Sequence, residues 1–290
     1  MRFKRVYIEI SNICNMHCSF CSPLKRQKQI MSVEQFDHIT TQIQPYCEYV
    51  YLHVKGEPLM HPYLSEIMDI CERKHLRVNL TTNGTLIPQR KELLFSKPAL
   101  RQVNLSLHSF SEHDCDEPGF SEDRYVDSLI RFVKEASEHK IISILRLWNL
   151  NDDHQADEKS IEIMKKLQNE TGYEGDLCED MAHKNRVKLM PYTFLSWDEQ
   201  FEWPSMDNSY FSETGRCHGM RDLIAVLVDG SVVPCCLDAD GIIRLGNLYQ
   251  QSFEQILNSD RAKAITEGFR NQKVTEELCR HCTYRKRFDR

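Results

Sequence analysis

Twelve cysteines are many for a chain of 290 residues, and their spacing is the first sign of chemistry in this sequence. Most of them form two groups in polar stretches, one near each end of the chain: Cys14, Cys18 and Cys21, then Cys217, Cys235, Cys236, Cys279 and Cys282. Burial as small hydrophobic residues accounts well for Cys47 and Cys71, which lie in helical or strand-like patterns. It accounts poorly for the two groups, and grouped cysteines of this kind indicate metal binding.

The first group has the spacing Cys14-x3-Cys18-x2-Cys21 and directly follows the first expected strand. Three thiolates at this spacing can hold three corners of a cubane iron–sulfur cluster. The fourth iron then stays open for a small-molecule ligand, as the metal of a catalytic site does. Zinc with His17 as a fourth ligand is the alternative, and it is less expected because zinc ligands usually come in pairs.

The second group supplies four ligands, Cys217, Cys235, Cys279 and Cys282, which suffice for one fully coordinated iron–sulfur cluster. A structural zinc ion held by the same four thiolates is the alternative, and the spacing does not separate the two. Cys236 either replaces Cys235 or stays a thiol.

Short β-rich stretches alternate with longer amphipathic ones through the first two-thirds of the chain. The expected strands are Arg5–Ser11, Glu48–Val54, Arg77–Thr82, Gln102–His108, Ile141–Asn149 and Arg186–Met190. The expected helices are Ser32–Gln44, His61–Lys74, Gln89–Ser96, Ser121–His139 and Glu158–Thr171. Six β–α units predict an α/β fold, a partial (β/α)6 TIM-like barrel with its helices outside.

The pattern changes after Pro191, and we expect a domain boundary near residue 205. A hairpin is predicted for Leu223–Val228 and Ser231–Pro234, with its turn at Asp229-Gly230. The predicted domains are therefore the partial barrel, residues 1–204, and a small C-terminal iron–sulfur domain, residues 205–290.

Polar residues recur at alternate positions of the expected strands, so they share one face of the sheet. The rows are Tyr7-Glu9-Ser11, Tyr51-His53-Lys55, Asn79-Thr81-Asn83, Asn104-Ser106-His108, Arg146-Trp148 and Lys188-Met190. A dry core cannot hold such rows without partners, so we expect a wet or ligand-filled interior. The alternative is that some strands turn this face to solvent.

Five members of these rows are candidate catalytic residues, and their charged side chains suggest a polar substrate: Glu9, His53, Lys55, His108 and Lys188. Aromatic side chains could stack on a flat ring, although ordinary packing explains each of them equally well. They are Trp148, Tyr192, Trp197, Phe201 and Trp203.

The composition is that of an ordinary globular protein, with 41% hydrophobic and 28% charged residues. A net charge of −6 argues against a nucleic-acid partner and against an anionic membrane surface, despite the basic tail Arg285-Lys286-Arg287. No apolar run is long enough for a membrane span, and no signal-peptide pattern precedes the first strand, so a cytoplasmic location is expected.

The cysteine motif resembles that of the radical S-adenosylmethionine (SAM) superfamily, including the aromatic Phe20 before the third cysteine. Lys55-Gly56-Glu57-Pro58 is similar to the family's Gly-Gly-Glu-Pro element, which binds the amino group of SAM, although Lys55 replaces the first glycine. Thr81-Thr82-Asn83-Gly84 matches a further family pattern.

The resemblance continues on the next two strands. Ser106 and His108 occupy the family's usual position for contacts to ribose and substrate. Arg146 lies where the family often pairs with the SAM carboxylate, a contact that suits a guanidinium. The resemblance thus implies a [4Fe–4S] cluster on the three cysteines, with SAM bound beside it.

The chemistry implied by the resemblance is reductive cleavage of SAM to methionine and a 5′-deoxyadenosyl radical, which abstracts hydrogen from the substrate. A flavodoxin- or ferredoxin-type protein would supply the electron. The region from Cys217 to Cys282 resembles the SPASM/twitch extension of this superfamily, which implies a second [4Fe–4S] cluster.

Three functions stay open from the sequence. The first is an enzyme acting on a small nucleobase-like or sugar-like ring; compact twitch-type relatives include queuine lyase, which implies release of 7-aminomethyl-7-deazaguanine in queuine salvage. The second is a SPASM-type peptide maturase or radical dehydrogenase, less expected because no peptide-recognition wing precedes Cys14. The third is a non-enzymatic regulator, which the Glu57 motif and the polar strand faces disfavour.

Overall fold

The computed structural model describes residues 2–108, 121–150, 156–199 and 201–288. The chain forms two compact units. The first comprises Met1–Cys14, Phe20–Val78 and Phe201–Arg290, and the second comprises Asn15–Ser19 and Asn79–Gln200.

The first unit combines the N-terminal strands with the C-terminal region. Its strands are β1 (Arg5–Ile8), β2 (Tyr49–Tyr51), β8 (Leu223–Val226), β9 (Ser231–Val233) and β10 (Gly246–Asn247), in the order β10-β9-β8-β1-β2. β1 is parallel to both β2 and β8. β8 and β9 are antiparallel, which confirms the predicted hairpin.

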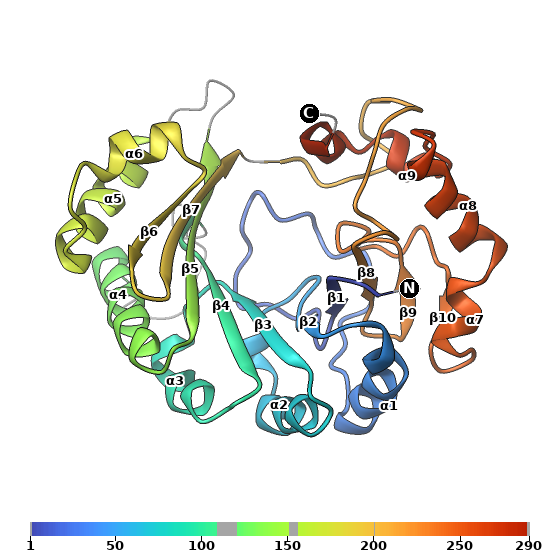
Figure 1. The fold of residues 1–290 in the computed structure, drawn as a ribbon, viewed down its shortest axis with the longest axis horizontal. Helices are drawn as coiled ribbons and strands as arrows, with labels where there is room; N and C mark the ends of the chain where they lie inside the picture. Colours follow the sequence, from blue (N-terminus) through green and yellow to red (C-terminus); the bar gives the residue numbers. More distant parts are fainter. Residues whose placement is uncertain (1, 109–120, 151–155, 200, 289–290) are drawn as a thin grey trace. The chain divides into compact units, whose positions relative to one another are not determined.

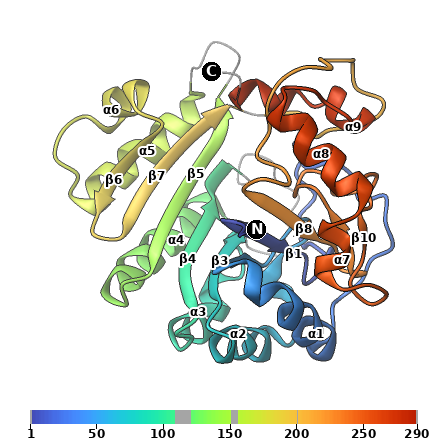
Figure 2. The ribbon, with the colours of Figure 1, turned by 45° about the vertical axis from the view of Figure 1, so that its right-hand side comes forward.

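The helices of this unit come from its N-terminal and its C-terminal segments. They are α1 (Val33–Ile43), α2 (Leu64–Arg73), α7 (Phe253–Leu257), α8 (Asp260–Arg270) and α9 (Glu277–Arg280), with 3-10 turns η1 (Gln44–Tyr46), η2 (Pro58–Met60) and η4 (Thr283–Phe288). Figure 2 shows α7 and α8 beside the C-terminal strands. Ser32 caps α1 in a capping box with Gln35, and this fixes where the helix begins.

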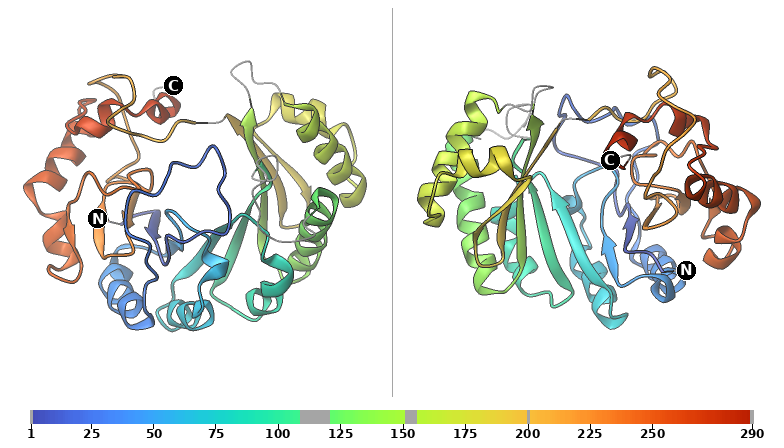
Figure 3. Two further views of the ribbon diagram at one scale, coloured as in Figure 1. Left: turned by 180° about the vertical axis from the view of Figure 1, so that it is seen from behind. Right: turned by 45° about the horizontal axis from the view of Figure 1, so that its top comes forward.

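The chain between β1 and α1 runs through residues 9–32 as a long loop, drawn in blue in Figure 3. A bridge between Ser11 and Ile30 closes the base of this loop. The three N-terminal cysteines lie on it.

The second unit is built from alternating strands and helices. They are β3 (Arg77–Thr82), which begins in the first unit, α3 (Ile87–Phe95), β4 (Leu100–Ser106), α4 (Glu122–Glu138), β5 (Ile142–Leu150), α5 (Glu158–Thr171), α6 (Leu177–His183), β6 (Arg186–Met190) and β7 (Thr193–Glu199). The strand order is β3-β4-β5-β7-β6, and Figure 1 shows α3, α4 and α5 along one face of these strands. Apolar side chains such as Leu105, Leu129 and Leu145 are fully buried there.

The α/β class is confirmed, and the strand order ends at β10 and β6 without closing on itself, as expected of a partial barrel. One element was wrongly placed: Arg186–Met190 is not the last parallel strand, because β6 is antiparallel to β7. β7, which the sequence did not suggest, is the strand parallel to β5. The two are joined by Pro191 and Tyr192, and Tyr192 has the left-handed φ of 59° that a tight turn requires.

The C-terminal strands extend the order of the first unit beyond β1, and the compact units divide at Phe201. The domain boundary between residues 204 and 205 stays a prediction. Among the described residues no helix is long and apolar enough to cross a membrane.

Candidate functional site

The first cysteine group lies on the loop between β1 and α1. Cys14 and Cys18 are half-buried and Cys21 is exposed. Cys14 and Cys21 belong to the first unit and Cys18 to the second. Every cysteine in the described part of the chain is a thiol rather than half of a disulfide, so the group is chemically available for a cluster.

Lys55, which follows β2 in the chain, reaches the third cysteine. Its Nζ donates hydrogen bonds to Cys21 Sγ at 3.2 Å and to the carbonyl and hydroxyl oxygens of Ser22, both at 2.6 Å. The same ammonium lies 4.0 Å from the ring centroid of Trp203. Lys55 is only 6% exposed. It therefore holds the turn that carries Cys21.

The carboxylate of Glu9, which was predicted to be catalytic, accepts hydrogen bonds from three different residues. This carboxylate, fully buried, accepts two hydrogen bonds from Arg26 Nη2 at 2.7 and 2.8 Å. It also accepts the backbone N–H groups of Lys55 at 3.1 Å and of Val228 at 3.0 Å. Burial raises the pKa of the Glu9 carboxyl, and Arg26 opposes that rise. These contacts make Glu9 a positioning residue for the loop, and its catalytic role stays a prediction.

Gly56, in the segment after β2, lies against the backbone of the cysteine loop. A Cβ there would lie 2.4 Å from the carbonyl oxygen of Ser11, and its φ of 78° is left-handed. The neighbouring Glu57 donates its backbone N–H to Ile13 O at 2.8 Å. This close approach explains why a glycine stands here although Lys55 has replaced the glycine before it.

Glu57 and Pro58 form the start of η2, and the Glu57 carboxylate accepts the N–H of Leu59 at 2.9 Å. His53 precedes this segment, and its ring lies edge-on to Tyr7 with centroids 5.4 Å apart. Their roles toward SAM and substrate stay predictions.

In the second unit Asn83, after β3, holds the residue that follows Cys14. Asn83 Nδ2 donates to Asn15 Oδ1 at 3.0 Å, and Asn15 Nδ2 donates to Thr85 Oγ1 at 2.9 Å. Asn83 Oδ1 accepts the backbone N–H and the hydroxyl of Thr85. The Asn83 motif thus positions the cysteine loop, in addition to any contact with SAM.

Ser106, His108 and Arg146 also meet in the second unit. Ser106 and Arg146 are register partners on β4 and β5, and His108 Nδ1 lies 3.1 Å from Arg146 O. The Arg146 guanidinium lies 4.5 Å from the ring centroid of Trp148. Burial and the charge of Arg146 lower the pKa of His108 to about 4, although the hydrogen bond with Arg146 O opposes this shift. His108 is therefore neutral near neutral pH, with one ring nitrogen as a donor and the other as an acceptor.

Lys188 lies on β6 and is exposed. The sequence grouped it with the interior charges because it counted β6 among the parallel strands. The antiparallel direction of β6 removes the basis of that grouping, and a catalytic role of Lys188 stays a prediction without structural support.

The second cysteine group converges in the first unit. Burial raises the pKa of Cys235 well above its ordinary value, and the neighbouring cysteines Cys236, Cys217, Cys279 and Cys282 raise it further. Burial and the neighbouring Cys217 likewise raise the pKa of Cys282 to about 11. Among the described residues, no three His, Cys, Asp or Glu side chains are arranged around one point to hold a single metal ion. Cys282 is buried and Cys217, Cys235 and Cys279 are half-buried, and four neighbouring thiols of this kind suit the thiolate set of an iron–sulfur cluster.

Arg285 organises the segments that carry these cysteines. It is 1% exposed, and its guanidinium donates to the carbonyl oxygens of Cys279, Thr214 and Ser212 at 2.7 to 3.0 Å. The sequence showed Arg285 only as part of a basic tail. Its role could not be predicted, because it depends on carbonyl groups about 70 residues away.

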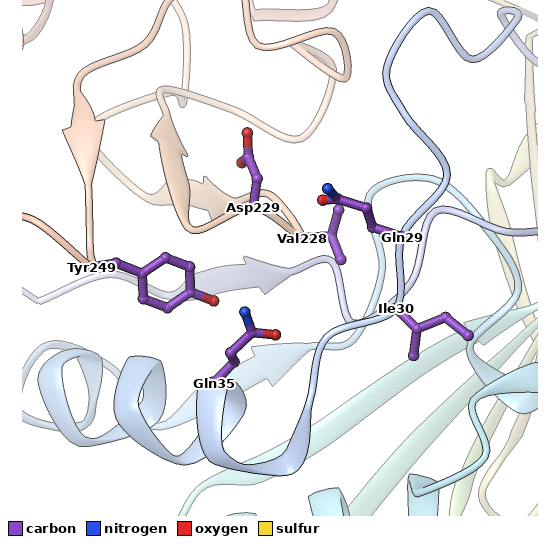
Figure 4. A pocket seen from close by; sticks show the side chains of 6 residues that line it. All are labelled: Gln29, Ile30, Gln35, Val228, Asp229 and Tyr249. Atoms are coloured by element: carbon purple, nitrogen blue, oxygen red, sulfur yellow. The ribbon is translucent and has the colours of Figure 1, made fainter.

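A surface pocket of about 390 Å³ also lies in the first unit. Figure 4 shows its lining: Gln29, Ile30, Gln35, Val228, Asp229 and Tyr249. None of the predicted site residues lines it. Val228, whose backbone N–H reaches the Glu9 carboxylate, belongs both to this lining and to the contacts described above.

A family model fits the part of the chain that carries these motifs. The model of the radical SAM superfamily matches residues 8–164, more than half of the chain. The chain belongs to the radical SAM superfamily. A second model, the iron–sulfur cluster-binding domain SPASM, matches residues 217–283. The protein therefore has a [4Fe–4S] cluster with SAM as its partner, together with additional iron–sulfur binding in the SPASM region.

Two curated relatives have names of different kinds, one for bacteriocin biosynthesis and one for a GTP cyclase. The antilisterial bacteriocin subtilosin biosynthesis protein AlbA of Bacillus subtilis is 25% identical over 87% of this chain and 58% of its own length. The GTP 3',8-cyclase of Alkaliphilus oremlandii is 22% identical over 54% of this chain and 51% of its own length. The radical SAM chain thus spans about half to three-fifths of these relatives.

Two solved structures share the fold. Streptococcus suis SuiB bound to the precursor peptide SuiA has a TM-score of 0.63 and 16% identity, covering 97% of this chain and 70% of SuiB. BtrN in complex with AdoMet and 2-DOIA has a TM-score of 0.58 and 16% identity, covering 98% of this chain and 94% of BtrN. At these identities the likeness supports the fold alone.

Proposed function

We propose that this radical SAM enzyme abstracts hydrogen from a peptide substrate. Cys14, Cys18 and Cys21 hold the cluster that cleaves SAM in this proposal. Cys217, Cys235, Cys279 and Cys282 hold one auxiliary cluster, and Cys236 is a thiol outside it. The supporting observation is that these four cysteines, one buried and three half-buried, lie near one another inside the region that matches SPASM.

When bound, SAM and its cluster supply the 5′-deoxyadenosyl radical, and the chain's residues position them. The amino group of SAM is assigned to Gly56-Glu57-Pro58, its ribose to Ser106, and its carboxylate to Arg146, whose guanidinium suits a bidentate contact. Phe20 and Asn83 complete this set. His53 and neutral His108 are the candidates for substrate contact.

A peptide substrate is favoured because AlbA, the relative that spans most of this chain, is a bacteriocin biosynthesis protein. SuiB, whose structure was solved with a precursor peptide, shares the fold. These relatives favour peptide modification over the small ring that the sequence suggested first.

A small polar ring is the second candidate, and the GTP 3',8-cyclase match favours it. Queuine lyase is one form of this candidate. It rests on the sequence resemblance alone, since the relatives described above are not lyases by name.

Anaerobic reconstitution tests the shared part of the proposal. We expect about eight irons per chain and 5′-deoxyadenosine formation with SAM and a reductant. Cys18→Ala should lose SAM cleavage, whereas Cys236→Ala should keep its iron and its SAM cleavage. Zinc in place of iron, with no SAM cleavage, would overturn the proposal.

The substrate class is tested by mass spectrometry of two parallel reactions. One contains precursor peptides, SuiA among them, and the other contains queuine or GTP. A peptide that changes mass together with 5′-deoxyadenosine formation supports the peptide proposal. Release of 7-aminomethyl-7-deazaguanine from queuine would replace it with the lyase.

A further inference from the structure

Lys55 stands where the superfamily pattern has a glycine, and its side chain points back to a cluster cysteine. The ammonium group has three N–H donors. Three acceptors receive them: Cys21 Sγ at 3.2 Å, Ser22 O at 2.6 Å and Ser22 Oγ at 2.6 Å. The ammonium is therefore fully hydrogen-bonded at one position rather than free to reach a substrate.

The Lys55 side chain is buried without a carboxylate partner. None of the ion pairs among the described residues of the first unit includes Lys55, although Arg26 nearby has Glu9 at 2.7 Å. A buried cation needs a compensating charge or a polarisable partner. The thiolate of Cys21 and the ring of Trp203 at 4.0 Å are the groups placed to provide it.

Trp203 holds the same turn from its other side. Its Nε1 donates to the carbonyl oxygen of Phe20 at 3.1 Å. Phe20, Cys21 and Ser22 are thus fixed by one indole and one ammonium, and the indole in turn supports the ammonium. The backbone N–H of Lys55 is tied to Glu9, so the donor is anchored at both ends.

We propose that Lys55 sets the reduction potential of the SAM-cleaving cluster through its hydrogen bond to Cys21. This inference rests on the proposed function, in which Cys21 is a cluster ligand. One-electron reduction by an external low-potential donor adds one negative charge to a thiolate-ligated cluster. A cation bonded to a ligand sulfur stabilises that charge, so Lys55 raises the potential and eases reduction.

The test is a redox titration of anaerobically reconstituted full-length protein, followed by electron paramagnetic resonance with titanium(III) citrate as reductant. The SAM-cleaving cluster is the one whose signal changes when SAM is added. At the wild-type midpoint, the ratio of reduced to oxidised cluster should be at least ten-fold lower in Lys55→Met. For a one-electron couple this corresponds to a midpoint about 59 mV more negative.

Three comparisons keep the inference separate from simple loss of structure. Lys55→Gln keeps a donor but removes the charge, so its midpoint should fall between wild type and Lys55→Met. Lys28→Met removes an exposed lysine of the same loop and should leave the midpoint unchanged. The auxiliary cluster of each variant serves as an internal reference and should not shift.

An unchanged midpoint in Lys55→Met would overturn the inference. So would failure of both Lys55 variants to assemble a SAM-responsive cluster while the auxiliary cluster persists, because Lys55 would then be only a structural brace. A wild-type protein without any SAM-responsive cluster would instead overturn the proposed function, so the two failures are distinguishable.

Discussion

Replacing Arg26 by methionine should leave Glu9 as an uncompensated charge in the core of the first unit. The Glu9 side chain is 0% exposed and that of Arg26 is 11% exposed, and the pair makes two hydrogen bonds of 2.7 and 2.8 Å. Breaking a buried pair by removing one partner costs about 3–5 kcal/mol. We expect Arg26→Met to lose about that much free energy of unfolding at pH 8.

The loss should shrink in acid. Burial already raises the pKa of Glu9, and removal of the Arg26 charge raises it further. A carboxyl with a raised pKa in the folded state binds protons that the unfolded chain releases, so its contribution favours folding at low pH and is lost as pH rises. At pH values between the pKa of Glu9 in the unfolded chain and its higher pKa in the folded protein, each rise of one pH unit lowers the unfolding free energy by about 1.4 kcal/mol.

Urea denaturation of the anaerobic protein at pH 6 and pH 8, followed by circular dichroism, measures both effects against wild type. The double variant Glu9→Gln/Arg26→Met should be more stable than Arg26→Met alone, because it carries no buried charge. Lys25→Met is the matched control: Lys25 is 59% exposed, with ion contacts of 3.9 and 4.0 Å, and its loss should cost less than about 1 kcal/mol. A pH-independent loss, or one below about 1 kcal/mol in Arg26→Met, would refute the reasoning.

Three further predictions follow from the same contacts. Gly56→Ala should cost about 3 kcal/mol and lower the iron content, because the new Cβ meets the Ser11 carbonyl at 2.4 Å at a left-handed φ; iron analysis and urea denaturation check this. Cys282→Ala should lose the auxiliary cluster while keeping SAM cleavage, measured by iron content and 5′-deoxyadenosine, and full iron retention would contradict it. His108→Gln should lessen the loss of stability between pH 6.5 and 4, because a pKa lowered to about 4 prevents the folded state from binding a proton that the unfolded state accepts.

Local sequence patterns predicted the elements whose signals are local. β3 and α5 have the expected bounds, and the hairpin of β8 and β9 forms at Asp229-Gly230. β7 was missed because its turn, Pro191-Tyr192, lacks the glycine or asparagine that usually marks a left-handed residue. The direction of β6 was wrong for the same reason.

The cysteine motifs were visible in the sequence because their members lie close together and few other patterns resemble them. The residues that hold the cysteine loop in place could not be identified from the sequence. The bond from Trp203 to Phe20 spans 183 residues, and Arg26 gave no signal for its pairing with Glu9. Phe20, Arg26 and Trp203 lie in loops, and residue types alone do not specify where a loop brings its side chains.

The polar rows on the strands illustrate how the interior charges are used. Glu9 was expected to face a ligand, yet Arg26 and two backbone N–H groups account for its carboxylate. Asn104, fully buried, donates to Leu80 O at 3.1 Å within the second unit. Some of the polar side chains that were expected to face water or a ligand are thus hydrogen-bonded to other groups of the protein.

Arg26 and Lys55 are both cations near Glu9, and they differ in the partner that neutralises them. Arg26 has the carboxylate, which makes a closed pair that can only brace the loop. Lys55 gives its backbone N–H to the same carboxylate but turns its ammonium toward Cys21. Only the second arrangement places a positive charge beside a sulfur whose electron density changes when the cluster is reduced. In the proposal, Lys55 therefore sets the reduction potential of the cluster, whereas Arg26 stabilises the conformation of the loop.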